Sequence, residues 1–304
     1  MNVIVYGAGA LGSFFGGLLS TQHQVTLVGR PAHVQAVKRE GLRISGETSL
    51  VAHPAAVTSL SEAPDAVHSD LVLLTVKAFH TRQAVEDVAA HTSAPLLSLQ
   101  NGLGNYERMA EVVPETSVLA GTTTTGATLL GEGQVREAGR GVAQIGSPSG
   151  AEHRARDAVA LLLRGGIDCE RSAAIDEALW AKAIVNAAIN PLTALTGLRN
   201  GMLVEVPELR ELLGAVAEEA ANVARRCGVF VREGIAGPVE AICRQTAQNR
   251  SSMLQDVSAG RRSEIDFING EIARRAEERG LPAPLCRALT ALVHGLEARE
   301  EAGG

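Results

Sequence analysis

The feature that most constrains the fold is a strand, turn and helix signature at the start of the chain. Residues 3–6 are apolar or aromatic and predict a short buried strand of a parallel sheet. Residues 13–20 continue as a helix, and a second strand is expected at residues 25–28. The turn between the first strand and the helix has the GxGxxG pattern and consists of Gly7, Ala8, Gly9, Ala10, Leu11 and Gly12. In this context the glycines predict a dinucleotide site, with pyrophosphate at the helix N-terminus.

The end of the second predicted strand indicates which dinucleotide is bound. An NAD site usually carries an acidic residue there, which binds the ribose 2′-hydroxyl. No Asp or Glu precedes Glu40, and the strand runs instead into Gly29-Arg30. Because a guanidinium pairs well with a 2′-phosphate, whereas an acid would repel it, Arg30 favours NADPH over NADH.

Further strands are predicted at residues 71–76, 95–99 and 118–120, which fits a doubly wound α/β sheet. Lys77, Asn101 and the Gly/Thr run at 121–125 follow these strands directly. Ligands of such sheets bind at the carboxyl ends of the strands, so these residues are candidate contacts. Each could equally be a solvated loop residue, and Asn-Gly is a common turn sequence. Residues 127–146 are expected to form short antiparallel strands at the sheet edge, followed by a helix at 152–163 and a strand at 167–169.

The second part of the chain has helical periodicity throughout, which predicts two domains, residues 1–172 and 173–304. Long helices are expected at 207–226 and 238–249. Ser263 and Asp266 have the spacing of a capping box for a helix reaching about residue 279. The last helix is expected to open at Pro282 or Pro284.

One stretch of this second part places a cation and two amides on a single helical face. Lys182, Asn186 and Asn190 recur every four residues in an otherwise apolar segment. Pro191 lacks an N–H, so we expect the helix to kink or break around Asn190. A solvent-exposed polar stripe is the alternative, but repeated Asn is a poor choice for an exposed helix, which favours a buried or cleft-facing role.

Composition excludes several classes of function. The formal net charge is −6 and no Lys/Arg-rich run is present, which argues against binding to nucleic acid or anionic membranes. Cys169, Cys227, Cys243 and Cys286 are scattered, so reduced thiols and no metal site are expected. No apolar run is long enough for a membrane span, and the glycines near the N-terminus argue against a signal peptide. We therefore expect a cytoplasmic protein, and the sequence leaves its oligomeric state, a homodimer included, open.

Taken together, these segments resemble the ketopantoate reductase (2-dehydropantoate 2-reductase) family over nearly the whole chain. The matching segments, in the family's order, are GAGALG at 7–12, Lys77, Asn101-Gly-Leu-Gly104, Trp180-Ala-Lys182, Asn186, Asn190-Pro-Leu-Thr193, Ser251-Ser-Met-Leu-Gln-Asp256 and Glu264-Ile-Asp-Phe-Ile-Asn-Gly270. The resemblance implies a Rossmann domain, an all-helical C-terminal domain and NADPH-dependent reduction of ketopantoate to pantoate, on the route to pantothenate and coenzyme A.

The resemblance also implies roles for individual residues. Lys182 takes the position of the general acid, and Asn101 that of a residue touching both nicotinamide and substrate. The implied substrate-binding residues are Asn186, Asn190, Asn200 and Ser252, and the implied cofactor-side contacts are Lys77, Ala127 and Glu264. The chain departs from the pattern at His80, where many relatives carry Gln, and at Thr125, where His is common.

The chemistry of these residues fits that reaction. Hydride transfer to a ketone carbon builds negative charge on oxygen, which a nearby ammonium such as that of Lys182 stabilises and protonates. Burial would lower the pKa of Lys182 and the Glu264 carboxylate would raise it, and the sequence does not decide which effect is larger. No arginine is placed by motif against the substrate carboxylate. Two alternatives remain, a related NADPH-dependent reductase of another 2-oxo acid and a non-catalytic NADP(H)-binding sensor.

Overall fold

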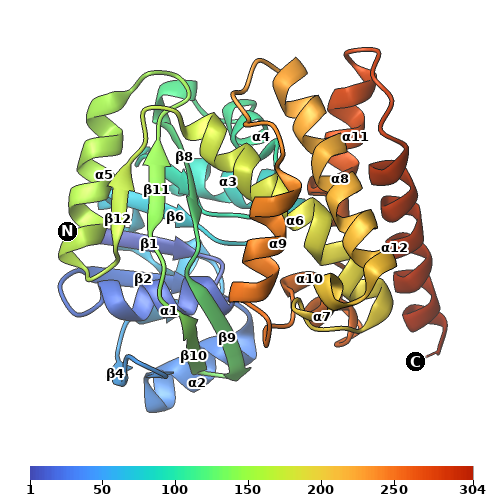
Figure 1. The fold of residues 1–304 in the computed structure, drawn as a ribbon. Helices are drawn as coiled ribbons and strands as arrows, with labels where there is room; N and C mark the ends of the chain where they lie inside the picture. Colours follow the sequence, from blue (N-terminus) through green and yellow to red (C-terminus); the bar gives the residue numbers. More distant parts are fainter. Residues whose placement is uncertain (304) are drawn as a thin grey trace. The chain divides into compact units, whose positions relative to one another are not determined.

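The structure, a computed structural model, describes residues 1–303. The chain divides into two compact units (Figure 1). Unit 1 comprises Met1–Gln100 and Asn105–Ala178, and unit 2 comprises Asn101–Gly104 and Leu179–Gly304. The four-residue segment Asn101–Gly104 therefore belongs with the C-terminal helices, although unit 1 continues on both sides of it.

Unit 1 is built on an eight-stranded, mostly parallel sheet. Only the pairing of β8 with β11 is antiparallel. The order β5-β2-β1-β6-β7-β8 is that of a Rossmann fold, which confirms the predicted fold class. The strands, in sheet order, are β12 (Cys169–Arg171), β11 (Ala143–Gly146), β8 (Val118–Thr123), β7 (Leu96–Ser98), β6 (Leu71–Leu74), β1 (Asn2–Tyr6), β2 (Gln24–Val28) and β5 (Ala55–Val57).

Both faces of this sheet are covered, which explains why its strands are continuous apolar runs. Val3 and Val5 of β1 pack in the core that also contains residues of α1 and α5, whereas Ile4 packs in the core that contains residues of α3 and α4. The helices of unit 1 are α1 (Ala10–Leu19), α2 (Pro31–Glu40), α3 (Thr81–His91), α4 (Asn105–Ala110) and α5 (Glu152–Arg164).

The expectation for residues 127–146 was partly wrong. The segment forms antiparallel β9 (Gly126–Gly131) and β10 (Gln134–Gly139), but these strands belong to a separate four-stranded sheet. β10 pairs in parallel with β3 (Leu42–Ser45), which in turn pairs with β4 (Leu50–Ala52). The strands β3 and β4 were not predicted from the sequence, so β9 and β10 were expected at the edge of the main sheet.

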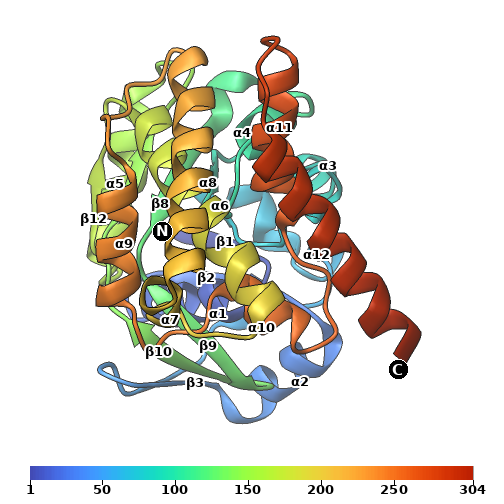
Figure 2. The ribbon, with the colours of Figure 1, turned by 45° about the vertical axis from the view of Figure 1, so that its right-hand side comes forward.

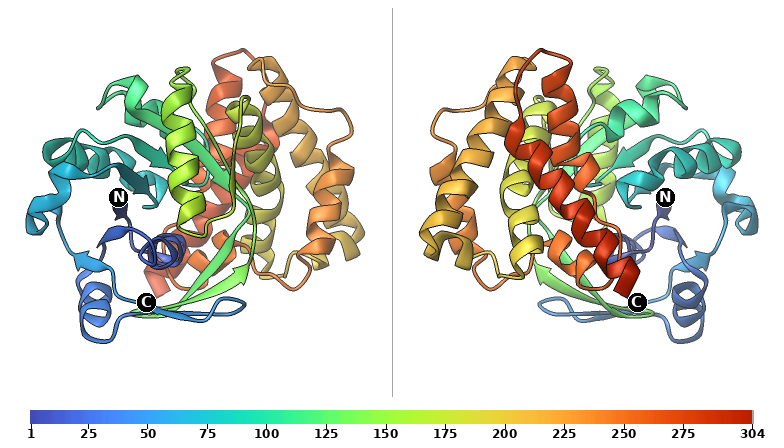
Figure 3. Two further views of the ribbon diagram at one scale, coloured as in Figure 1. Left: turned by 90° about the vertical axis from the view of Figure 1, so that its left-hand side faces the viewer. Right: turned by 90° about the vertical axis from the view of Figure 1, so that its right-hand side faces the viewer.

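Helix α1 contacts strands of both sheets, β1 and β2 of the main sheet and β3, β4, β9 and β10 of the small one. In Figure 3 the strands β9 and β10 of the small sheet are drawn in green. A Cβ at Gly16 would lie 2.3 Å from Cδ2 of Leu27 in the main sheet. A Cβ at Gly17 would lie 2.6 Å from Cδ1 of Ile44 in the small sheet. The small residues of this helix therefore allow it to contact both sheets at close range.

Unit 2 consists of helices among the residues described (Figures 1 and 2). Its core contains residues of α6, α8, α9 and α11, and α11 and α12 lie side by side in Figure 2. The helices are α6 (Ile175–Thr196), α7 (Met202–Glu205), α8 (Pro207–Arg226), α9 (Ala236–Gln245), α10 (Ser252–Val257), α11 (Asn269–Glu277) and α12 (Pro284–Gly303). A short 3₁₀ helix, η5 (Ile265–Phe267), precedes α11.

Two local predictions for this unit need correction. Helix α6 does not break at Asn190, because it continues through Pro191 to Thr196. The proposed capping box is also wrong: the Ser263 N–H donates to Glu297, and Asp266 pairs with Arg262 and His294. Among residues 1–303 the Ser263 hydroxyl accepts only from the Ile265 N–H of the short η5, and Asp266 pairs with other side chains, so the two residues do not cap a single long helix.

No helix within residues 1–303 is long and apolar enough to cross a membrane. The described cysteines are free, with Cys169, Cys243 and Cys286 buried.

The position of α1 leads to a test of packing. Gly16→Ala should lower the free energy of unfolding by about 1–3 kcal/mol, because the added methyl group overlaps Leu27. Gly295→Ala is the matched control, since that helical glycine has no heavy atom within 4 Å of an added Cβ. It should instead stabilise the protein by roughly 0.5–1 kcal/mol. Circular dichroism during thermal unfolding measures both, and equal shifts in the midpoint would contradict the packing argument.

Candidate functional site

The glycine turn of unit 1 owes its shape to two positions that exclude a side chain. Gly7 has φ +114°, and a Cβ there would lie 2.5 Å from the backbone nitrogen of Val76. At Gly12 a Cβ would lie 2.2 Å from the Gly7 carbonyl oxygen. These two glycines are needed for the close packing of the turn, as the sequence pattern predicts.

Gly9 differs from its neighbours because its side-chain position is open. It is exposed, and no heavy atom lies within 4 Å of a Cβ built there. Gly9 is also the N-cap residue of α1, which has no side-chain cap and no acidic residue in its first turn. The first N–H groups of a helix lack intrahelical acceptors and attract anions. The open surface at Gly9 and the uncapped helix end together fit a pyrophosphate group.

Two residues that sequence reasoning missed support this edge of the sheet. The Thr75 hydroxyl donates to the Gly7 carbonyl at 2.8 Å and so fixes the glycine turn against the end of β6. The Gln100 side chain donates to the Val76 carbonyl and to the Thr81 hydroxyl, both at 2.9 Å. Because Val76 directly precedes Lys77, Gln100 fixes the backbone from which Lys77 projects. The available signal was the position of both residues at strand ends.

Arg30 is the N-cap of α2 and is exposed. Within residues 1–303 its guanidinium has no hydrogen-bond or ion-pair partner. The nearby His33 is buried and lies 3.0 Å from the Ser13 hydroxyl, while its Nδ1 accepts from the Gly133 N–H. Burial lowers the pKa of His33, the adjacent Glu132 carboxylate raises it, and the Arg30 charge lowers it. Sequence reasoning missed His33, which ties α1, α2 and the β9–β10 turn together.

The other predicted contacts of unit 1 are on neighbouring elements. Lys77 is half-buried directly after β6, and Ala127 lies on β9, which packs against α1. The two departures from the family pattern sit in ordinary structural settings. His80 is exposed with its ring against Phe79, and the Thr125 hydroxyl donates to the Gly141 carbonyl.

In unit 2, helix α6 presents Lys182, Asn186 and Asn190 along one face. Asn190 is 4% exposed, whereas Asn186 and Lys182 are partly buried. Within residues 1–303 the side-chain amides of Asn186 and Asn190 make no hydrogen bond. A buried amide normally has a partner in a folded protein. The face is therefore not a solvated stripe, and its two amides have donors and acceptors available for a ligand.

Glu264 is the charged neighbour of Lys182. Its side chain is buried, and it is the N-cap residue of η5. Burial lowers the pKa of Lys182 to about 8, and the Glu264 carboxylate acts in the opposite direction. The question that the sequence left open is thus decided in favour of burial. An amine with this pKa exchanges its proton readily near neutral pH.

The loop carrying Asn101 packs against the same short helix. The Leu103 N–H donates to the Phe267 carbonyl at 2.8 Å. Gly102 has φ +87°, and a Cβ there would lie 2.4 Å from the Phe267 carbonyl oxygen. This close backbone contact explains the glycine and places Asn101 beside the segment of Glu264. Asn101, Lys182 and Glu264 thus all belong to unit 2, where the Glu264 charge acts on Lys182 and the Asn101 loop contacts the helix that follows Glu264.

Asn200 and Ser252 occupy different settings. The Asn200 side chain is buried and donates to the Thr246 hydroxyl at 3.0 Å, while its Oδ1 is buried without a hydrogen-bond partner in the described residues. Ser252 is exposed at the first position of α10, and the next two residues of that helix, Met253 and Leu254, are buried. Ser251 is the N-cap residue of that helix and accepts from the Leu254 N–H.

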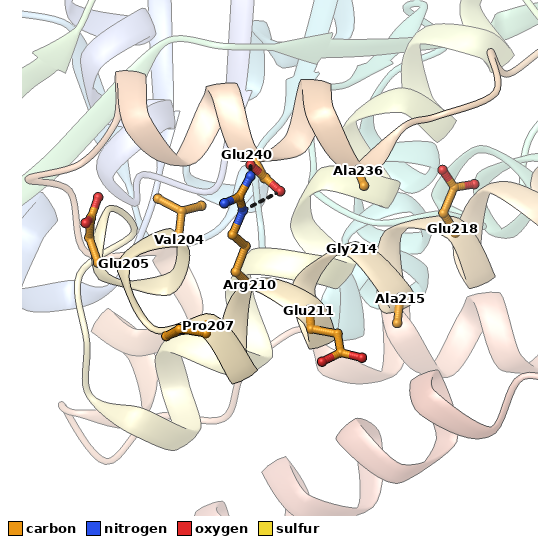
Figure 4. A pocket seen from close by; sticks show the side chains of 10 residues that line it. All are labelled: Val204, Glu205, Pro207, Arg210, Glu211, Gly214, Ala215, Glu218, Ala236 and Glu240. Carbon is orange, nitrogen blue, oxygen red and sulfur yellow. Dashed lines mark hydrogen bonds and ion pairs between the residues drawn. The ribbon is translucent and has the colours of Figure 1, made fainter.

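A surface groove of about 630 Å³ lies apart from these residues, between α7, α8 and α9 (Figure 4). Arg210 and Glu240 point toward one another across it and form an ion pair at 2.8 Å. Its other charged lining residues are carboxylates: Glu205, Glu211 and Glu218. An anionic 2-oxo acid would be repelled by this lining, so the groove is not the site for such a ligand. No group of three or more His, Cys, Asp or Glu residues suited to a metal occurs among residues 1–303.

Two family models together match most of this chain. Residues 3–150 match the family described as "Ketopantoate reductase PanE/ApbA", and residues 174–297 match "Ketopantoate reductase PanE/ApbA C terminal". A 2-dehydropantoate 2-reductase from Archaeoglobus fulgidus is 40% identical over 97% of this chain and 98% of its own length. One from Halobacterium salinarum is 38% identical over 96% of this chain and 98% of its own length.

Solved structures share the architecture. A PanE/ApbA family ketopantoate reductase from Ralstonia eutropha superposes with a TM-score of 0.90 at 35% identity, covering 99% of this chain and 100% of that one. A D-mandelate dehydrogenase solved with NADH and anilino(oxo)acetate gives a TM-score of 0.91 at 29% identity, again over 99% and 100% of the two chains. On the strength of both family matches and of the near full-length relatives, this chain belongs to the ketopantoate reductase family.

Proposed function

We propose that this protein reduces ketopantoate to pantoate, taking hydride from NADPH and a proton from Lys182, in the pathway to pantothenate and coenzyme A. The observation that carries the proposal is the α6 face of unit 2. It combines an amine whose pKa is about 8 with the side-chain amides of Asn186 and Asn190, which make no hydrogen bond within residues 1–303. The named relatives are 2-dehydropantoate 2-reductases, which supports this choice among 2-oxo acids.

The dinucleotide, when bound, supplies the hydride. In this proposal its pyrophosphate is held by the turn Gly7–Gly12, where the open position at Gly9 and the uncapped N-terminus of α1 suit an anion. Lys77, Asn101, Ala127 and Glu264 are the further contacts that we assign to it. Its adenosine ribose phosphate is assigned to Arg30, whose exposed guanidinium has no competing ion pair within the described residues.

Lys182 performs the acid step in this mechanism. As the ketone carbon accepts hydride, the charge that develops on its oxygen is stabilised by the ammonium, which then transfers a proton to that oxygen. With a pKa of about 8, the amine is mostly protonated at pH 7 yet gives up its proton more easily than an ordinary lysine. Glu264 helps to keep the amine charged despite its burial.

Substrate recognition is assigned to Asn101, Asn186, Asn190, Asn200 and Ser252. Amide and hydroxyl groups both donate and accept, which suits the carboxylate and hydroxyl groups of a small hydroxy acid. Asn190 supports this role best, because it is nearly fully buried and its amide has no protein partner in the described residues.

A reductase of another 2-oxo acid is the second candidate. A D-mandelate dehydrogenase has the same fold at 29% identity, and it was solved with NADH. Such a reductase would share the acid and the glycine turn, and would differ in the residues that surround the rest of the substrate.

The assay that tests the proposal is NADPH oxidation with ketopantoate and a panel of other 2-oxo acids. We expect ketopantoate to give the highest kcat/KM, and Lys182→Ala to lower kcat by about 10²-fold or more. Lys38→Ala removes an exposed lysine in unit 1 and serves as the matched control, with little effect expected. A higher kcat/KM with an aromatic 2-oxo acid would favour the second candidate. NADPH binding without any turnover would indicate a sensor instead of an enzyme.

The pH dependence follows from the state of Lys182. Only the protonated amine can donate, so kcat/KM should be constant below pH 7 and fall about tenfold per pH unit above about pH 8. Glu264→Gln should move this decline to lower pH, because the carboxylate raises the pKa of the amine. Asp266→Asn is the control, since Asp266 pairs with Arg262 and His294 instead. A rate that stays constant to pH 10 would exclude Lys182 as the proton donor.

Cofactor preference provides a separate test of Arg30. Arg30→Glu should raise the Michaelis constant for NADPH far more than that for NADH, because the new carboxylate would repel the 2′-phosphate. Arg39→Glu makes the same charge change in the last turn of α2 and should affect both cofactors little. Steady-state kinetics with both cofactors measures the ratio, and equal effects of Arg30→Glu on the two would remove the assignment.

A further inference from the structure

Pro191 leaves a gap in the hydrogen bonds of helix α6. An α-helical N–H donates to the carbonyl four residues earlier, and proline has no N–H. The carbonyl of Ala187 therefore lacks its usual donor, the N–H four residues later, although the helix continues through Pro191 to Thr196. Ala187 is fully buried, so water does not replace the missing donor. An unpaired buried carbonyl is costly, and a donor is needed from elsewhere.

Asn269 provides that donor. Its Nδ2 donates to the Ala187 carbonyl oxygen at 3.0 Å, and its side chain is fully buried. The second polar atom of the amide, Oδ1, is buried and has no hydrogen-bond partner among the described residues. An apolar residue would avoid that unpaired oxygen but could not donate. The amide N–H group is thus the donor to the Ala187 carbonyl, and the same side chain also forms a hydrogen bond with the Cys286 thiol of α12.

The position of Asn269 connects α6 with the segment of Glu264. Asn269 opens α11, immediately after η5, whose N-cap residue is Glu264. Its bond to Ala187 thus fixes the Glu264 segment against α6 at a point between Asn186 and Asn190. Ala187 lies between Lys182 and Asn190 along α6, and all three precede Pro191, so this bond joins the Glu264 segment to the stretch of helix that carries the proposed site residues.

A second contact holds the part of α6 that follows the proline. The hydroxyl of Thr193 lies 2.6 Å from that of Ser251 and within 3.0 Å of the Asn190 and Ile189 carbonyls. Ser251 caps α10, which begins at Ser252. Both sides of Pro191 are thereby tied to segments that carry proposed site residues.

We propose that Asn269 is a positioning residue, whose side-chain amide replaces the missing N–H of Pro191 and so holds Lys182, Asn186 and Asn190 in the geometry for reduction of the keto acid. This inference rests on the proposed function for its catalytic readout. Asn269 need not touch substrate or dinucleotide, and acts through the α6 backbone. Displacement of a catalytic group by about 1 Å is enough to lower a rate by up to 10²-fold.

The test is a double-substitution cycle between Asn269 and Pro191. Asn269→Ala and Asn269→Asp each remove the amide donor, and we expect kcat to fall at least about tenfold and KM for the keto acid to rise. KM for the dinucleotide should change by less than about twofold, because the glycine turn is in unit 1. Pro191→Ala restores a backbone N–H to Ala187, so Asn269→Ala combined with Pro191→Ala should recover most of the loss. Thermal unfolding midpoints of the same variants should show the same recovery.

Thr196→Val is the matched control. It removes the hydrogen bond from the Thr196 hydroxyl to the Leu192 carbonyl in the same helix, but that carbonyl keeps its ordinary backbone N–H donor. It should leave kcat and both KM values unchanged. The inference is overturned if the Asn269 variants keep the parental kcat and KM. It is also overturned if Pro191→Ala gives no recovery, so that Asn269→Ala causes the same loss of activity or of folding with proline and with alanine at position 191. A parent protein that reduces no keto acid would refute the proposed function instead, and the unfolding midpoints would still report the coupling of Asn269 with position 191.

Discussion

The proposed site of the helical unit depends on the burial of one amine, that of Lys182. Removing Lys182 from water disfavours its charged form, and the pKa falls to about 8 because Glu264 offsets only part of that effect. A carboxylate can act in this way only if its backbone is fixed. Glu264 lies next to η5, which accepts a hydrogen bond from Leu103 of the Asn101 loop and is followed by Asn269, bonded to α6. The Glu264 segment is thus joined to the Asn101 loop by a backbone hydrogen bond and to the helix that bears Lys182 by the side chain of Asn269.

The N-terminal unit depends on a different constraint, the close approach of backbone to backbone. Gly7 and Gly12 admit no side chain because the ends of β1 and β6 meet there, whereas Gly9 has open space beside it. Helix α1 in turn needs Gly16 and Gly17 because it packs between two sheets. The same short segment therefore forms the anion-binding surface and a central layer of the fold.

Sequence patterns predicted the parts of this molecule that depend on local periodicity. The buried parallel strands are continuous apolar runs, and α8 begins at Pro207 and ends at Arg226 as expected from its flanking Pro and Gly signals. The small sheet was missed because β3 and β10 pair across some ninety residues of chain, which no local pattern records. Of the kink or break expected around Asn190, the break does not occur, and the donor to the Ala187 carbonyl, Asn269, is likewise distant in sequence. For the candidate site, the sequence pattern predicted which residues contribute and in what order. It missed His33, Thr75 and Gln100, because their roles are hydrogen bonds to segments distant in sequence.

The loop Asn101–Gly104 has a consequence for the independence of the two units. Its neighbours in sequence belong to unit 1, yet Leu103 is buried in the core of unit 2, where it is 4% exposed. A fragment ending at Ala178 would carry this leucine without the helices that cover it, and a fragment beginning at Leu179 would lack the loop that donates to Phe267. We therefore expect each unit to lose contacts when it is produced alone, although each has its own core. A chain organised in this way resists exchange of its helical half as a block, because part of that half is encoded within the other.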